Sequence, residues 1–295
     1  MLRRTCLVLA VIVCLVAPVV VQAQGDYLDV YMVKVRPEKL ADFQVIAKKM
    51  VDANRKYNGD HWLATETVYG EGDTYTFISN REDYAEIDKG SDAFNGALVK
   101  AYGKDGAQKL LNDWEACVAK SRSELRRRRW DLSRKAPDAA SYAKFIADSR
   151  LLRTTAVQVR PGHVTEFEDL LKEAKAAAEK VPSTQPVLVS QVIEGTKGTT
   201  FYVSTLRTSI GGFDKNPTMR EILGEDGYKK FLQVNAEAVE GSESMLLRFS
   251  AELSNPTQEV IAAAPDFWQP KAVVATHTAK PKAPAEPAAQ RTKQQ

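Results

Sequence analysis

The sequence VKVRP at residues 33–37, followed by Phe43, occurs a second time as VQVRP at residues 157–161, followed by Phe167. Each copy runs from alternating β-branched residues into a proline, which is well tolerated in the first turn of a helix. The two copies are 124 residues apart. We therefore interpret each one as the junction between a first strand and a first helix.

Two further matches follow in the same order. GKDG at residues 103–106 recurs as GEDG at residues 224–227, and the pattern S-x-S-x-L-x-R at residues 121–127 recurs at residues 242–248. Both of these matches are 121 residues apart. Matches that keep their order while their spacing drifts indicate a duplicated domain with loop insertions.

The first copy has the predicted order β-α-β-β-α-β. Residues 28–35 alternate as a strand, and apolar residues from Leu40 onward fall on one face of a helix. A glycine-containing turn at residues 70–73 joins two short strands, helical segments follow, and residues 124–132 form the final strand. The second copy shows the same order between residues 152 and 253.

This order is that of the ferredoxin-like fold. The sequence therefore predicts an α+β protein with two tandem ferredoxin-like repeats, at residues 24–133 and 150–256, joined by a linker at residues 134–149. Helices on one face of each sheet leave the other face bare. We expect the two repeats to pack sheet to sheet, so that burial of these faces does not require a second chain.

The repeated motifs resemble the dimeric α+β barrel superfamily, whose members pair two ferredoxin-like units. The resemblance rests on the two strand-to-helix junctions, on the aromatic residue six positions after each proline, and on the hairpin glycines Gly70 and Gly195. The superfamily includes antibiotic-biosynthesis-type monooxygenases, haem-degrading enzymes and NIPSNAP-like proteins. The resemblance implies two tandem copies that form one intrachain barrel, a fold that hosts many activities.

Residues 1–23 have the features of a secretory signal peptide. Arg3 and Arg4 precede an apolar run at residues 6–21, and Val21-Gln22-Ala23 is a small-residue cleavage pattern. The alternative is a membrane anchor, but the run is shorter than the ~20 residues of a spanning helix and contains Pro18. We expect a secreted or periplasmic protein after cleavage near Ala23.

Charge is nearly balanced, with 41 Lys and Arg residues against 38 Asp and Glu residues. This balance does not favour a nucleic-acid partner. Residues 257–295 are rich in Ala, Pro and Lys, a composition that predicts a disordered tail. The tail could contact an anionic envelope surface, or it could serve only to keep the protein soluble.

Haem and metal sites need ligands, and His61 is the histidine best placed to reach a pocket, because it begins a strand beside Trp62. The alternative is an ordinary histidine at a strand end. No cluster of His, Cys or carboxylate residues has the spacing of metal ligands. The sequence also lacks nucleotide-binding glycine patterns, so we predict no metal, haem or other cofactor.

Alternation within strands points to a second group of candidates. Trp62 and Glu66 share one face of their strand, and Gln191 occupies the place of Glu66 in the second copy. A buried Glu66 facing an inter-sheet cavity would have a raised pKa and could act as a general base. The alternative is a hydrogen-bonded structural glutamate.

The last strand of the first copy contains four consecutive arginines at residues 126–129, followed by Trp130. Alternation places Arg126, Arg128 and Trp130 on one face. Two arginines beside an aromatic wall could bind a carboxylate or phosphate group. The alternative is an edge strand that its charges protect from aggregation.

The first hypothesis is an exported tandem α+β barrel protein that binds a small aromatic or anionic ligand between its sheets. One alternative is a cofactor-independent enzyme with monooxygenase-like or isomerase-like activity in that space. Another is a non-catalytic envelope or partner-binding module. An inter-sheet space filled by side chains would exclude the ligand and enzyme hypotheses.

Overall fold

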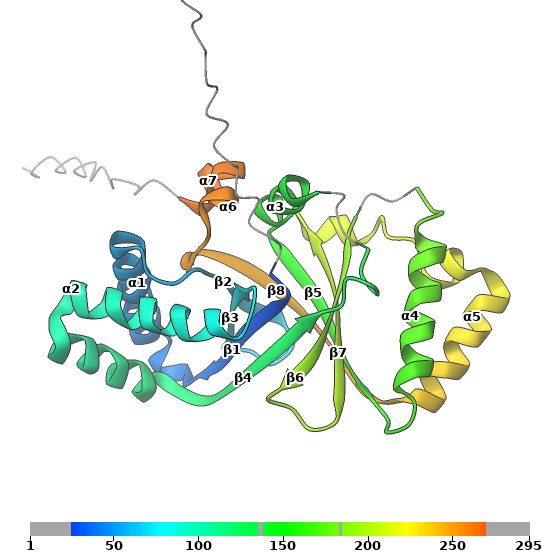
Figure 1. Cartoon of the computed structure of the whole chain (residues 1–295), viewed down its shortest axis with the longest axis horizontal. Coiled ribbons are helices and arrows are strands. Elements are labelled where there is room, and N and C mark those ends of the chain that lie inside the picture. The colour runs from blue at the N-terminus through cyan, green and yellow to red at the C-terminus, as the bar shows by residue number, and fades with distance from the viewer. Residues whose placement is uncertain (1–24, 135–137, 183–184, 270–295) are drawn as a thin grey trace, which may run out of the picture.

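The computed structural model describes residues 25–134, 138–182 and 185–269, which contain eight strands in one closed antiparallel barrel (Figure 1). The strands are β1 (Tyr27–Val35), β2 (Trp62–Tyr69), β3 (Thr74–Arg81), β4 (Val118–Arg128), β5 (Leu151–Val159), β6 (Val187–Glu194), β7 (Thr199–Arg207) and β8 (Val239–Asn255). The helices are α1 (Leu40–Tyr57), α2 (Ala85–Cys117), α3 (Ala139–Asp148), α4 (Val164–Ala178), α5 (Met219–Ala238), α6 (Gln258–Ala263) and α7 (Pro265–Trp268).

The order of elements β-α-β-β-α-β occurs twice along the chain, once in β1 to β4 and once in β5 to β8. Around the barrel the strands follow the order β1-β3-β2-β8-β5-β7-β6-β4. The two halves are joined where β2 pairs with β8 and where β4 pairs with β6, with Ala64 opposite Ser250 and Arg127 opposite Gln191.

The single intrachain barrel that the resemblance implied is present, with its strands closed into one antiparallel ring. A separate four-stranded sheet would leave backbone N–H and C=O groups unpaired along both of its edges. The pairing of β2 with β8 and of β4 with β6 provides hydrogen-bond partners for these groups. The inner faces of the closed barrel lie apart, around a cavity that is partly open to solvent. The edge-strand alternative for residues 124–132 is wrong, because β4 spans Val118–Arg128 and pairs with both β1 and β6.

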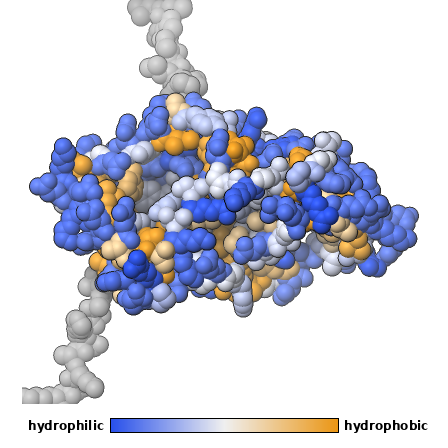
Figure 2. All heavy atoms as spheres, turned by 90° about the horizontal axis from the view of Figure 1, so that it is seen from below, coloured by the Kyte–Doolittle hydropathy of each residue, from blue (hydrophilic) through white to orange (hydrophobic). Residues whose placement is uncertain are grey.

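Helices cover the outside of the barrel, with α1 and α2 on one side and α4 and α5 on the other (Figure 1). In α1 the predicted apolar face is buried, including Phe43, Ile46 and Met50. The corresponding buried residues of α4 are Phe167 and Leu170. Seen from below, apolar residues occur in small groups among hydrophilic ones (Figure 2).

The repeated GxDG motifs mark a kink in the second long helical region of each half. Gly103 interrupts α2 with φ 72° and Gly224 interrupts α5 with φ 70°. Glycine reaches this region of positive φ without the steric cost that a side chain would impose. The residues after each glycine therefore restart a helix, as expected for a structural motif.

Ordered helices lie where the sequence predicted a linker and the start of a disordered tail. Helix α3 lies within residues 134–149, and α6 and α7 fall within the predicted tail. Trp268 is fully buried, and its Nε1 donates to the carbonyl of Ala147 over 3.0 Å. The prediction of disorder is wrong for residues 258–268 because apolar residues there pack against α3 and β8.

Several predictions concern residues that the structure does not describe. The signal peptide at residues 1–23 lies outside the described residues, as does the tail from residue 270 onward. Within the described part of the chain, no helix is both long enough and apolar enough to span a membrane.

Candidate functional site

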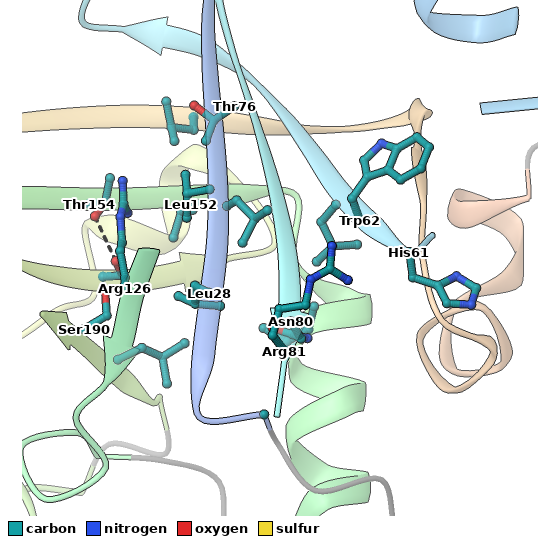
Figure 3. Close-up of a pocket in the computed structure, with 18 of the residues that line it drawn as sticks. Leu28, His61, Trp62, Thr76, Asn80, Arg81, Arg126, Leu152, Thr154 and Ser190 are labelled. Carbon is teal, nitrogen blue, oxygen red and sulfur yellow. Dashed lines mark hydrogen bonds between the residues drawn. The ribbon is translucent and has the colours of Figure 1, made fainter. Parts of the chain in front are cut away.

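The barrel contains a cavity of about 910 Å³ that is partly open to solvent. Small-molecule sites commonly have volumes of roughly 300–1,000 Å³. Inward-facing strand residues, such as Leu28, Thr76, Arg126 and Leu152, form much of the cavity wall (Figure 3). The space between the sheets is therefore not filled by side chains, so the ligand and enzyme hypotheses both survive this test.

Helices close one end of the cavity. Every pair of neighbouring strands is antiparallel, so β4 and β8, four places apart in the ring, run in the same direction and finish at the same end. Helices α3, α6 and α7 gather at that end (Figure 1). Tyr142 and Ile146 of α3 and Val260 of α6 contribute to the cavity wall there.

Opposite sides of the barrel have opposite chemical character. The wall that β4 presents to the cavity carries four cations, Lys120, Arg122, Arg126 and Arg128. The wall that β8 presents carries Glu243, Met245, Leu247 and Phe249. A ligand in this cavity would therefore meet a basic surface on one side and a largely apolar surface on the other.

A buried carboxylate neutralises part of the basic wall. Glu124 is 1% exposed and forms ion pairs with Arg122 and Arg126, with 2.7 Å between Arg126 Nη2 and Glu124 Oε2. The Tyr202 hydroxyl donates to Glu124 Oε1 over 3.3 Å, and the Arg126 guanidinium lies 3.4 Å from the centre of the Tyr202 ring. Burial raises the pKa of Tyr202. This cluster holds the Arg126 guanidinium over the Tyr202 ring.

Arg128 differs from the other arginines of the cavity wall. Arg81 donates from both Nη atoms to Asp60, over 2.7 and 2.6 Å, while Arg122 and Arg126 pair with Glu124. Among the described residues, Arg128 has no carboxylate within ion-pair distance. Its charge is therefore available to an anionic ligand.

The hydrogen-bond partners of Arg128 are neutral. Its Nη1 donates to the Tyr142 hydroxyl over 2.8 Å, and its Nη2 donates to Asn80 Oδ1. Its Nε is buried and has no partner within the described part of the chain. The guanidinium lies 5.1 Å from the centre of the Trp130 ring. Because the buried Nε has lost its water without gaining a hydrogen bond, the free energy of the Arg128 cation is raised. A bound anion would lower that free energy.

Five of the seven residues predicted from the sequence line this cavity: His61, Trp62, Arg126, Arg128 and Trp130. His61 is exposed at the rim, and its Nδ1 is 3.3 Å from the Asn255 carbonyl oxygen. Trp62 lies largely in the core beneath α2, where its ring meets Phe94 edge to face. The candidates that reach deepest into the barrel thus come from β4.

Glu66 and Gln191 share a face, as alternation predicted, but that face is the outer one. Glu66 pairs with Arg248 over 3.5 Å and is 40% exposed. Gln191 accepts a hydrogen bond from Arg129 Nη1 over 2.9 Å. Neither residue lines the cavity. The prediction that Glu66 faces an inter-sheet space is therefore wrong, since alternation alone does not identify the inward face.

Sequence reasoning missed several polar residues of the site, including the three that contact Arg126 or Arg128 without carrying a charge. Asn80, Tyr142 and Tyr202 line the cavity and contact the arginines of β4. Tyr142 lies in the segment predicted as a linker, so no repeat pattern marked it. The described residues contain no group of three or more His, Cys, Asp or Glu side chains that could hold a metal ion.

No protein family matches the chain, and no curated protein matches it. Among solved structures, an anthrone oxidase-like protein is 13% identical, with 78% of this chain and 93% of that chain covered and a TM-score of 0.48. A heme-binding protein from Thermus thermophilus is 11% identical, with 78% and 93% covered and a TM-score of 0.43. A chlorite dismutase variant from Candidatus Nitrospira defluvii is 8% identical, with 82% and 97% covered and a TM-score of 0.45. These similarities assign neither a family nor an activity to the chain.

Proposed function

We propose that the protein is an exported, tandem ferredoxin-like dimeric α+β barrel that binds a small amphipathic organic anion inside the barrel. The repeats would be residues 24–133 and 150–256, joined by residues 134–149. Support for the duplication comes from the repeated motifs and from the repeated order of elements. Support for export comes from the composition of residues 1–23.

The observation that carries the binding proposal is Arg128, the cavity-wall arginine without a carboxylate partner among the described residues. A partly dehydrated guanidinium is a strong donor to carboxylate groups, which it can engage through two parallel hydrogen bonds. The acid group of the ligand would therefore bind at β4, near the end covered by α3.

The rest of the ligand would be apolar and contain an aromatic ring. Leu247 and Phe249 of β8 face β4 across the barrel, and Leu152 and Leu206 adjoin them on β5 and β7. Burial of apolar ligand surface against such a wall contributes roughly 25 cal/mol per Å². Trp130 beside Arg128 adds an aromatic surface for a ring.

The enzyme alternative loses its proposed general base, because Glu66 faces away from the cavity. The envelope-module alternative rests on the outer surface and on the basic tail, and the tail from residue 270 onward lies outside the described residues. Neither alternative gains an observation of its own. Ligand binding is thus the function that the geometry supports best.

The test is equilibrium dialysis of the purified protein against 2-naphthoate, with Arg128→Gln as the test variant. We expect the wild type to bind and Arg128→Gln to bind roughly 10- to 100-fold more weakly, because a hydrogen bond to a charged group contributes about 1.5–3 kcal/mol. Arg127→Gln is the matched control, since Arg127 is the adjacent, exposed arginine of β4. Equal affinity in all three proteins, or no binding by the wild type, would contradict the proposal.

A further inference from the structure

Helix α3 places one side chain directly against the proposed anion site. The helix begins after Asp138, whose carboxylate accepts the backbone N–H of Ser141 over 2.7 Å, a standard N-cap. Its inward face contains Tyr142, Ile146 and Ala147, which are all buried. The Trp268 indole of α7 donates to the Ala147 carbonyl, and Trp268 belongs to the same buried cluster as Tyr142 and Ile146. These contacts hold Tyr142 in place beside the cavity.

The hydroxyl of Tyr142 keeps an unused donor. A phenol hydroxyl can accept hydrogen bonds and donate one. In the described structure the Tyr142 oxygen accepts from Arg128 Nη1 over 2.8 Å, and no hydrogen bond donated by the hydroxyl is present among the described residues. Tyr142 also lines the cavity and is 7% exposed. Its proton is therefore free to meet an oxygen atom of a ligand.

Resting on the function proposed above, we propose that Tyr142 and Arg128 together form a carboxylate clamp, which makes Tyr142 a specificity-determining residue of the site. The phenol O–H would donate to one carboxylate oxygen and the guanidinium to the other. A carboxylate suits this pair because it offers two oxygens, each with lone pairs, to donors that come from two directions.

Trp130 gives the clamp an aromatic side. The Trp130 and Tyr142 rings meet edge to face, with centres 6.0 Å apart and planes at 85°. The Arg128 guanidinium lies within 5.8 Å of the centre of each ring. An arylcarboxylate can place its ring beside these aromatic groups while its acid group reaches the clamp. The preferred ligand class is therefore an aromatic monocarboxylate.

The second half of the described chain has no equivalent clamp. The position of Arg128 is occupied by Phe249 in β8, and the helix that follows β8 has the sequence QEVIAA, without a tyrosine. One chain should consequently bind one carboxylate ligand rather than two, although its architecture is repeated.

The experiment compares Tyr142→Phe with wild type in equilibrium dialysis against two probes, 2-naphthoate and naphthalene. We expect Tyr142→Phe to weaken 2-naphthoate binding about tenfold and naphthalene binding less than twofold, because the substitution removes the donor and keeps the ring. Tyr102→Phe is the control, since its hydroxyl donates to the Lys49 carbonyl away from the cavity. Circular dichroism checks that each variant is folded.

A double variant separates a clamp from a purely structural tyrosine. If the two residues bind one carboxylate together, Arg128→Gln/Tyr142→Phe should bind 2-naphthoate within about threefold of Arg128→Gln alone. Unchanged 2-naphthoate affinity in Tyr142→Phe, with Arg128→Gln still impaired, would overturn the clamp and leave the proposed function standing. An equal loss of affinity for both probes, or two bound ligands per chain, would also overturn it. Absence of 2-naphthoate binding by wild type would overturn both proposals.

Discussion

Strands β4 and β8 occupy equivalent places in the two halves of the chain, yet over residues 121–128 and 242–249 their residues are identical on only one face. The four identical positions in residues 121–127 and 242–248 are Ser, Ser, Leu and Arg, which alternate along each strand. The inner positions between and after them all differ: Arg122, Glu124, Arg126 and Arg128 correspond to Glu243, Met245, Leu247 and Phe249. The positions at which the two strands differ make the cavity asymmetric.

This difference shows which side of the cavity would determine the specificity of the proposed binding site. Two identical halves around a ring would give two equivalent walls that face each other. Here β4 and β8 are four places apart in the eight-stranded ring and present a basic wall and a largely apolar one. An amphipathic ligand therefore has one favourable orientation across the barrel.

Removal of the buried Glu124 carboxylate from the basic wall should have the largest effect on the free energy of unfolding. We expect Glu124→Gln to lower the free energy of unfolding by about 3–5 kcal/mol, because Arg126 would remain buried without its ion-pair partner. Urea denaturation measures this change. The control is Glu243→Gln on β8, an exposed residue, which should change stability by less than about 0.5 kcal/mol.

The same wall can be rebuilt with the residues of β8. The double variant Glu124→Met/Arg126→Leu copies Met245 and Leu247, and it should be more stable than Glu124→Met alone by at least about 1 kcal/mol, because both buried charges leave together. A double variant that is less stable than Glu124→Met alone would contradict this prediction, because it would show that the apolar residues of β8 do not pack well at the equivalent positions of β4.

An ion pair on the outer face provides the smallest expected effect. Hydrogen bonds from Arg129 hold the pKa of Asp131 below its usual range. A carboxyl group with a lowered folded-state pKa stabilises the fold above its unfolded-state pKa of about 3.9, and this contribution is lost as pH falls through the folded-state value. Asp131→Asn should cost less than about 1 kcal/mol at pH 7, since the side chain is 53% exposed and screened.

Urea denaturation of wild type and Asp131→Asn at several pH values measures this contribution. The difference in stability should be constant between about pH 7 and pH 5 and should shrink below about pH 4. A difference that persists unchanged in strong acid would contradict the assigned ion pair.

The repeat pattern was sufficient to predict the strands and helices within each half but not how the halves join. Strand and helix order follow from local periodicity, as with the buried face of α1 that contains Phe43 and Ile46. The pairing of β2 with β8 joins residues far apart in sequence, such as Ala64 and Ser250, and no local pattern encodes it. The helices α6 and α7 were missed because the predicted tail, residues 257–295, was read as one segment, although Trp268 packs in a core.

For the site, alternation identified which residues share a face but not which face points inward. It grouped Arg126 with Arg128 and Trp130, which line the cavity, and Glu66 with Trp62, of which only Trp62 reaches the rim. Alternation within strands could not identify Tyr142, because this residue contacts Arg128 from helix α3, which lies outside the two repeated segments. Contacts of this kind depend on tertiary packing.

A crystal structure of the protein with 2-naphthoate would test the central claim most directly. The account predicts a single ligand inside the barrel, with its carboxylate within about 2.7–3.2 Å of Arg128 and its ring toward Leu247 and Phe249 of β8. A ligand outside the barrel, or one whose carboxylate faces β8 while its ring lies against β4, would contradict it.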